Sequence, residues 1–163
     1  HTATFNDGET RVGSGNLFCA YSHIGHESIV GDDCVFSNNA TLGGHCVIGD
    51  RVVIGGLSAV HQFVNVGTMA MIAGMARVVQ DVMPGMIVEG TPATHRTFNK
   101  VGLQRAGYSE EDLIMVKRLY KHFFRSKLNH GQAEEALLEG ALGDHRFHEL
   151  IKTFLEKSTR GLA

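Results

Sequence analysis

The stretch that decides the fold runs from Val12 to Val78 and reads VGSGNLFCAYSHIGHESIVGDDCVFSNNATLGGHCVIGDRVVIGGLSAVHQFVNVGTMAMIAGMARV. Every sixth residue in it is large and apolar: Val12, Phe18, Ile24, Val30, Phe36, Leu42, Ile48, Ile54, Val60, Val66, Ile72 and Val78. An α-helix repeats every 3.6 residues and a strand every two, whereas a hexapeptide parallel β-helix repeats every six. We expect the apolar residues to fill a prism, and the glycines that often follow them to relieve the backbone at its corners. The sequence therefore predicts a left-handed parallel β-helix.

The hexapeptide pattern covers only part of the chain, so we expect a mainly β fold with a C-terminal α part. We assign residues 1–94 to the β-helix, 95–108 to a linker and 109–163 to a small helical domain. A stacked solenoid should not begin with an uncapped coil. We therefore expect further coils before His1, and interpret the visible coils as the C-terminal coils of a longer prism.

Three helices are expected in the C-terminal domain. The first follows the capping box Ser109-Glu-Glu-Asp112. The second covers Gln132 to Leu142 with an interruption at Gly140, and the third begins behind an Asp144 cap. The apolar residues expected to face inward on the first and third helices are Leu113, Val116, Tyr120, Phe123, Phe124, Phe147, Leu150, Ile151, Phe154 and Leu155. So small a domain must pack on the prism or on a neighbouring subunit.

Composition excludes several classes of function. No run approaches the roughly 20 apolar residues that span a bilayer, so no integral membrane segment is expected. A formal charge of −2 gives no overall footprint for nucleic acid. The three cysteines lack metal-ligand spacing. Cys34 and Cys46 occupy the small-residue phase of the repeat, so we interpret them as buried thiols of a cytoplasmic protein.

The histidines gain meaning from the geometry of the prism. Three hexapeptides make one turn, so residues 18 apart stack roughly 4.8 Å from one another. His26, Gly44 and Gln62 then lie on successive coils at one edge, and His45 and His61 flank the last two of these positions. His23 lies on the same coil as His26. The remaining histidines are expected to be solvated surface residues: His95, His122, His130, His145 and His148.

Two kinds of chemistry fit such an edge. A zinc site needs three side chains converging about 2 Å from one ion, which would strain His26, His45 and His61 within one subunit. The paired histidines of γ-class carbonic anhydrases, on the same fold, lie five residues apart, and Val66 stands five after His61. The other option is acid–base chemistry. His26 with Glu27 offers an oriented base and Gly44 an N–H for an oxyanion, which suggests acyl transfer to a hydroxyl.

Longer motifs around these residues are specific to one family. They are Ser22-His23-Ile24-Gly25-His26, Asn38-Asn39-Ala40-Thr41-Leu42-Gly43-Gly44-His45, Ile54-Gly55-Gly56-Leu57-Ser58-Ala59-Val60-His61-Gln62-Phe63, Val79-Gln80-Asp81-Val82 and Ser158-Thr159-Arg160-Gly161-Leu162. With these motifs, and over essentially its whole length, the chain resembles the acyl-carrier-protein–UDP-N-acetylglucosamine O-acyltransferases, which begin lipid A biosynthesis. The resemblance implies transfer of an (R)-3-hydroxyacyl group from acyl-carrier protein to the 3-hydroxyl of UDP-N-acetylglucosamine.

The resemblance also implies roles for particular residues. His26 would be the general base with Glu27 beside it, Gly44 the oxyanion donor, and Gly74 the position that limits the acyl chain. The positions that would line the substrate site are His1, His23, His45, His61, Gln62, Asn99 and Arg105. The family implies a cytoplasmic homotrimer with no bound cofactor or metal, which uses the acyl-carrier-protein thioester as donor.

This sequence departs from the family pattern in three respects. Glu27 stands where the family usually has aspartate, so the carboxylate contact is made with a longer arm. Val101 and Ala106 replace polar positions that commonly help to hold the sugar nucleotide. The family's early coils, which contribute an acidic residue and a lysine to the site, are absent from this sequence.

Other functions stay open at this point. One is an N-acyltransferase acting on a UDP-amino-sugar, another is a zinc hydratase of the carbonic anhydrase kind, and a third is a non-catalytic, truncated trimeric β-helix. The acidic carrier protein should dock on a basic surface. The first helix carries such residues, which would serve equally as a solvated helix face: Lys117, Arg118, Lys121, Arg125 and Lys127.

Overall fold

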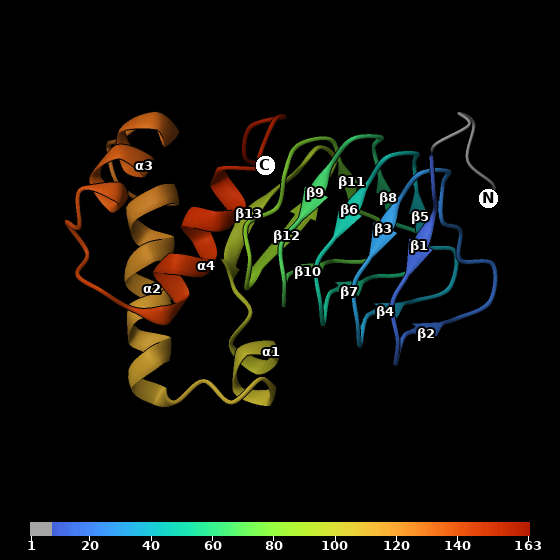
Figure 1. The fold of residues 1–163 in the computed structure, drawn as a ribbon, viewed down its shortest axis with the longest axis horizontal. Coiled ribbons are helices and arrows are strands. Elements are labelled where there is room, and N and C mark those ends of the chain that lie inside the picture. Colours follow the sequence, from blue (N-terminus) through green and yellow to red (C-terminus); the bar gives the residue numbers. More distant parts are fainter. Residues whose placement is uncertain (1–7) are drawn as a thin grey trace.

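The chain forms a left-handed parallel β-helix that ends in a group of helices (Figure 1). The computed structural model describes residues 8–163, so the predicted site residue His1 lies outside the described part. The strands of the prism are β1 (Arg11–Val12), β2 (Leu17–Phe18), β3 (Ile29–Val30), β4 (Val35–Phe36), β5 (Thr41–Leu42), β6 (Val47–Ile48), β7 (Val53–Ile54), β8 (Ala59–Val60), β9 (Asn65–Val66), β10 (Met71–Ile72) and β11 (Arg77–Val78). They stack into three parallel sheets, ordered β1-β3-β6-β9, β2-β4-β7-β10 and β5-β8-β11.

The strands pair with the register that the sequence predicts. Phe18 lies beside Phe36 and Leu42 beside Val60, in each case 18 residues along the chain. From Val30 to Val78 the large residue of every hexapeptide is at most 3% exposed. Val12 and Phe18, in the first described coil, are 44% and 39% exposed at the end of the prism. The apolar repeat therefore forms the prism interior, as expected.

The corners of the prism are formed by left-handed residues other than glycine. Their φ values lie between 51° and 65°, and they stack on three corners. We call these the histidine corner (Glu27, His45, Phe63), the second corner (Asp33, Arg51, Met69) and the third corner (Tyr21, Asn39, Leu57, Met75). The expectation that glycine relieves the corners was wrong. The repeat glycines instead permit close approach of successive coils, since a Cβ on Gly25 would lie 2.4 Å from the Gly43 carbonyl.

The range predicted as a linker contains regular structure. Strand β12 (Met86–Gly90) extends one sheet, and β13 (Ala93–Phe98) returns antiparallel beside it. Helix α1 (Lys100–Arg105) follows, with Asn99 as its N-cap. Much of the 95–108 range is thus part of the fold, while the division of the chain into domains stays a prediction.

Three further helices pack on the last coils (Figure 1). Helix α2 (Glu110–Phe124) starts with the predicted Ser109–Asp112 capping box, and α3 (His130–Leu138) ends before Gly140. Helix α4 (Arg146–Leu155) is capped by His145, so the predicted Asp144 cap was wrong. A second apolar core joins the three helices to methionines of the prism: Met69, Met83 and Met86. Among the described residues, no helix is long and apolar enough to cross a membrane.

A buried carboxylate fastens the end of the chain to the prism. Asp81 is fully buried, and its Oδ2 accepts hydrogen bonds from the Ser158 hydroxyl and from the amides of Thr159 and Arg160. Its backbone also pairs with Leu162. The closing Ser-Thr-Arg-Gly-Leu motif is therefore explained by folding, since each polar group that Asp81 satisfies would otherwise be left unpaired.

Two histidines expected at the surface are buried. His148 is 1% exposed and donates from Nδ1 to the Gly143 carbonyl. His95 is 6% exposed, donates from Nδ1 to the Ala163 carbonyl and accepts from the Met83 amide at Nε2. His95 is buried because β13 turns it inward against Phe124, on which its ring stacks. His122 and His145 are half-buried, and only His130 of the five is exposed.

The two thiols expected to be buried are buried. Cys34 and Cys46 are 0% exposed, and burial raises the pKa of Cys34 and brings that of Cys46 to about 11. At neutral pH both are thereby kept as thiols, which are poor nucleophiles.

His95 should make the protein acid-sensitive. Burial lowers its pKa from 6.5 to about 4, so below pH 6.5 the unfolded chain binds a proton that the folded chain excludes. Stability is complete above pH 6.5 and should fall by up to about 3 kcal/mol as the pH approaches 4. Urea unfolding of the wild type and of His95→Gln at pH 7 and pH 5 measures this loss. Equal losses in the two proteins would contradict the assignment.

Candidate active site

The histidine corner brings together residues from three successive coils. The His45 amide donates to the His26 carbonyl at 2.8 Å, and the Phe63 amide donates to the Gly44 carbonyl at 3.0 Å. These bonds hold the coils in register at the corner. The predicted stacking of His26 above Gly44 and Gln62 is therefore confirmed at the level of the backbone.

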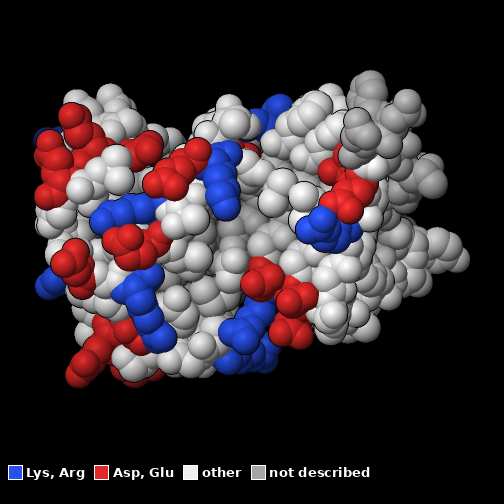
Figure 2. Space-filling model, in the orientation of Figure 1, with Lys and Arg blue, Asp and Glu red and all other residues white. Residues whose placement is uncertain are grey.

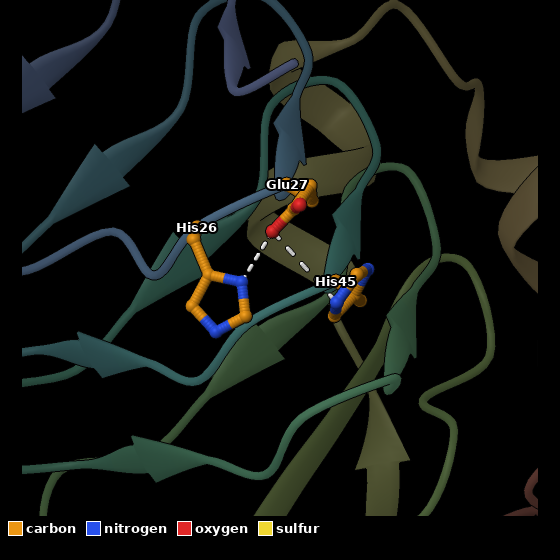
Figure 3. A group of neighbouring side chains, drawn as sticks. All are labelled: His26, Glu27 and His45. Atoms are coloured by element: carbon orange, nitrogen blue, oxygen red, sulfur yellow. Dashed lines mark hydrogen bonds and ion pairs between the residues drawn. The ribbon is translucent and has the colours of Figure 1, made fainter. Parts of the chain in front are cut away.

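A carboxylate lies between two imidazoles at this corner. Figure 3 shows Glu27 between His26 and His45. The His26 Nδ1 hydrogen-bonds to Glu27 Oε2, and His45 Nε2 lies 3.8 Å from the same oxygen. Neighbouring residues seldom face one another, but the left-handed backbone of Glu27, with φ of 51°, turns its side chain toward the His26 ring. The expected orienting contact is present.

The environment of these side chains suits an oriented base. The Glu27 side chain is only 8% exposed, while those of His26 and His45 are 36% and 29% exposed. The Glu27 amide donates to Thr10 Oγ1, which ties this coil to the one before it. A Glu27 carboxylate that accepts the Nδ1 proton leaves Nε2 of His26 as a proton acceptor at the surface.

Gly44 lies directly beside the ring of His26. A Cβ at position 44 would lie 2.6 Å from His26 Nε2 and from Cε1, so glycine is required for the ring to occupy this place. Among the described residues, the Gly44 amide donates no hydrogen bond. A proton acceptor and a free N–H therefore lie side by side, which is the arrangement that acyl transfer needs.

The sequence interpretation missed one residue of the corner, Phe63. Its ring stacks on His45, with centroids 4.7 Å apart and planes at 14°, and His45 meets His26 edge to face at 5.1 Å. Phe63 limits the positions that the His45 ring can take. The signal was present in the sequence, because Glu27, His45 and Phe63 are spaced by 18 residues.

Three further predicted residues lie near this corner in the coils. His61 and Gln62 are exposed, and His61 Nδ1 donates to the Gln62 carbonyl at 3.0 Å. His23 is exposed on the coil of His26 and bridges to Thr41 on the next coil. All three present polar groups to the surface beside the base.

The structure places the other predicted site residues on different corners. Asn99 is 5% exposed at the second corner, where its Nδ2 donates to the Met69 carbonyl while its Oδ1 accepts from Gly102. Arg105 is exposed at the end of α1. Gly74 lies at the third corner, where a Cβ would meet only the Gly56 backbone, at 3.3 Å from its oxygen. One chain therefore does not bring these three residues to His26.

Two family profiles match the chain. One, described as UDP N-acetylglucosamine O-acyltransferase, domain 2, matches residues 81–163. The other, the bacterial transferase hexapeptide, matches residues 9–44.

Curated relatives align with nearly all of the chain. An acyl-[acyl-carrier-protein]–UDP-N-acetylglucosamine O-acyltransferase from Fusobacterium nucleatum is 48% identical, covering 100% of this chain and 63% of the relative. The enzyme of the same name from Synechocystis is 39% identical, covering 96% of this chain and 56% of the relative. The chain thus spans less than two thirds of the length of these relatives.

Solved structures agree with the fold. The UDP-N-acetylglucosamine acyltransferase from Campylobacter jejuni superposes with a TM-score of 0.88 at 35% identity, covering 96% of this chain and 60% of that one. The Arabidopsis enzyme gives a TM-score of 0.92 at 29% identity, covering 99% of this chain and 59% of that one.

Gly44→Ala should displace the His26 ring, because the added Cβ would overlap Nε2 and Cε1. The ring signals of His26 in a histidine-selective NMR spectrum should shift as the Glu27 contact changes. Gly74→Ala is the matched control, since its Cβ meets no histidine and should leave those signals in place. Unchanged His26 signals in Gly44→Ala would contradict the geometry.

Proposed function

This chain belongs to the UDP-N-acetylglucosamine O-acyltransferase family, and we propose on that premise that it transfers an (R)-3-hydroxyacyl group from acyl-carrier protein to the 3-hydroxyl of UDP-N-acetylglucosamine. This reaction begins lipid A biosynthesis. The observation that carries the proposal is the contact of His26 with Glu27 directly beside the amide of Gly44.

The base and the acceptor act in the first step. The 3-hydroxyl oxygen attacks the thioester carbonyl while Nε2 of His26 takes its proton. The charge that develops on the imidazole is stabilised by the Glu27 carboxylate at Nδ1. Such general-base assistance typically contributes about 10²–10⁴-fold to the rate.

The oxyanion and the leaving group complete the reaction. The Gly44 N–H stabilises the negative oxygen of the tetrahedral intermediate, and one such donor is worth roughly 10²–10³-fold. The intermediate then expels the phosphopantetheine sulfur, which recovers the proton from His26. An ester bond forms, a thioester bond breaks, and no cofactor or metal takes part.

A homotrimer explains why the substrate residues lie on different corners. Asn99 and Arg105 lie at or near the second corner and Gly74 at the third, so a neighbouring prism must bring them to His26. The third corner is also strongly apolar, with Tyr21 84% and Met75 73% exposed. Three prisms around one axis would cover such surfaces and exclude water from the reaction.

The carrier protein would dock on helix α2. Five basic residues in its C-terminal half and just beyond it are exposed: Lys117, Arg118, Lys121, Arg125 and Lys127. None of them forms an ion pair with another described residue, which leaves them available to an acidic partner. Figure 2 shows basic and acidic residues interspersed over the helical end, so docking would rest on local pairing. The buried thiols Cys34 and Cys46 support a reducing, cytoplasmic setting.

His26→Asn should reduce acyl transfer by about 10³-fold, because the base is lost while the fold is kept. Mass spectrometry of reactions with acyl-carrier protein and UDP-N-acetylglucosamine measures the ester product. His130→Asn, an exposed histidine outside the corner, is the matched control and should retain the wild-type rate. A near-normal rate for His26→Asn would refute the mechanism.

The same assay separates the other candidate functions. A UDP-sugar with a 3-amino group would yield an amide, and a preference for it over the 3-hydroxyl would favour the N-acyltransferase. Absence of any transfer by the wild-type chain would favour the non-catalytic trimeric β-helix.

Gly74→Met should shift preference toward shorter acyl donors, because it fills the open space beside Gly56. Pockets discriminate by roughly tenfold or more per methylene group that no longer fits. We expect kcat/KM to fall at least tenfold for long donors and little for short ones. An equal fall for both would remove Gly74 from the acyl site.

A further inference from the structure

We propose that His26, Glu27 and His45 form a binding site for a divalent transition metal such as Zn²⁺, and that the ion blocks the catalytic base. Each residue offers one ligand atom, and these three atoms all lie within 4.8 Å of one another. Two imidazole nitrogens and one carboxylate oxygen are a recurrent zinc-binding set, with a fourth position left for water.

The geometry needs only small side-chain rotations. Zinc–nitrogen and zinc–oxygen bonds of about 2.1 Å at a tetrahedral angle place ligand atoms roughly 3.4 Å apart. His45 Nε2 and Glu27 Oε2 already lie 3.8 Å apart. The His26 Nδ1 contact with Glu27 is shorter and must open for an ion to enter between them. No movement of the backbone is required.

Burial and packing favour binding at this place. The Glu27 carboxylate is nearly buried, so it has little bulk water to lose when it binds an ion. The two histidines are partly exposed, which leaves a path for the ion and room for a water ligand. Phe63 stacks on the His45 ring and restricts its orientation, which reduces the entropy lost on binding.

This site differs from the histidine set considered from the sequence. Sequence reasoning asked whether His26, His45 and His61 could converge, and His61 instead turns its Nδ1 to the Gln62 carbonyl. The left-handed corner at residue 27 supplies Glu27 as the third ligand. The length of its side chain matters, because aspartate is one methylene shorter and would lie farther from the His45 ring.

Metal binding and acyl transfer should exclude one another. An ion on Nδ1 of His26 replaces the proton that orients the ring, and it also takes the Glu27 carboxylate that stabilises the charged imidazole. Inhibition by the metal rests on the proposed acyl transfer, whereas binding of the metal does not.

The test is titration of the untagged chain with ZnCl₂ against a chromophoric chelator, with Co²⁺ absorption as a second reading of coordination. We expect one ion per chain in the wild type. Glu27→Gln and His45→Asn should each weaken binding at least about tenfold, since loss of even an outer-shell partner costs that much. Asparagine tolerates the left-handed backbone at position 45, and His130→Asn is the control that should bind normally.

The outcomes are distinct. Equal zinc affinity in the wild type and in correctly folded Glu27→Gln and His45→Asn, with folding checked by circular dichroism, would overturn the site. Glu27→Asp should also bind zinc more weakly than the wild type. In the transfer assay, Zn²⁺ should abolish the wild-type rate and EDTA should restore it. A chain that binds zinc as expected but transfers no acyl group would refute the proposed function and leave the metal site standing.

Discussion

The structure depends on one constraint, the parallel hydrogen bonding of each coil to the coil 18 residues later. To keep that register, the chain must turn at three corners in every coil, and it does so with non-glycine residues in the left-handed region. Each such residue costs roughly 1–2 kcal/mol of backbone energy. Burial of one large apolar side chain per hexapeptide contributes about 1.5–3 kcal/mol, which offsets that cost.

The same constraint creates the chemistry of the histidine corner. Adjacent residues of an extended strand point in opposite directions, so His26 and Glu27 could not meet there. At a left-handed corner they face one another, and the next coil brings Gly44 and His45 to the same pair. Backbone strain is thus converted into an oriented imidazole, as is common where strained residues gather.

The extent of prediction from sequence follows from what a count of six can measure. It locates phases, and therefore gave the prism, its interior and the stacking of His26 over Gly44. It gives no backbone dihedral angles, so the glycines were assigned to corners that Glu27, His45 and Phe63 occupy instead. The burial of His95 depends on the antiparallel return of β13, which lies outside the repeat and has no periodic signal.

The two sites at the histidine corner depend on different levels of organisation. The atoms that would bind a metal come from two successive coils of one chain, so the fold of that chain suffices to assemble them. The groups proposed for acyl transfer are distributed over all three corners, with Asn99 on the second and Gly74 on the third. A triangular prism cannot bring its own corners together. Acyl transfer therefore requires neighbouring subunits, whereas the base and the ligands around it are properties of the single chain.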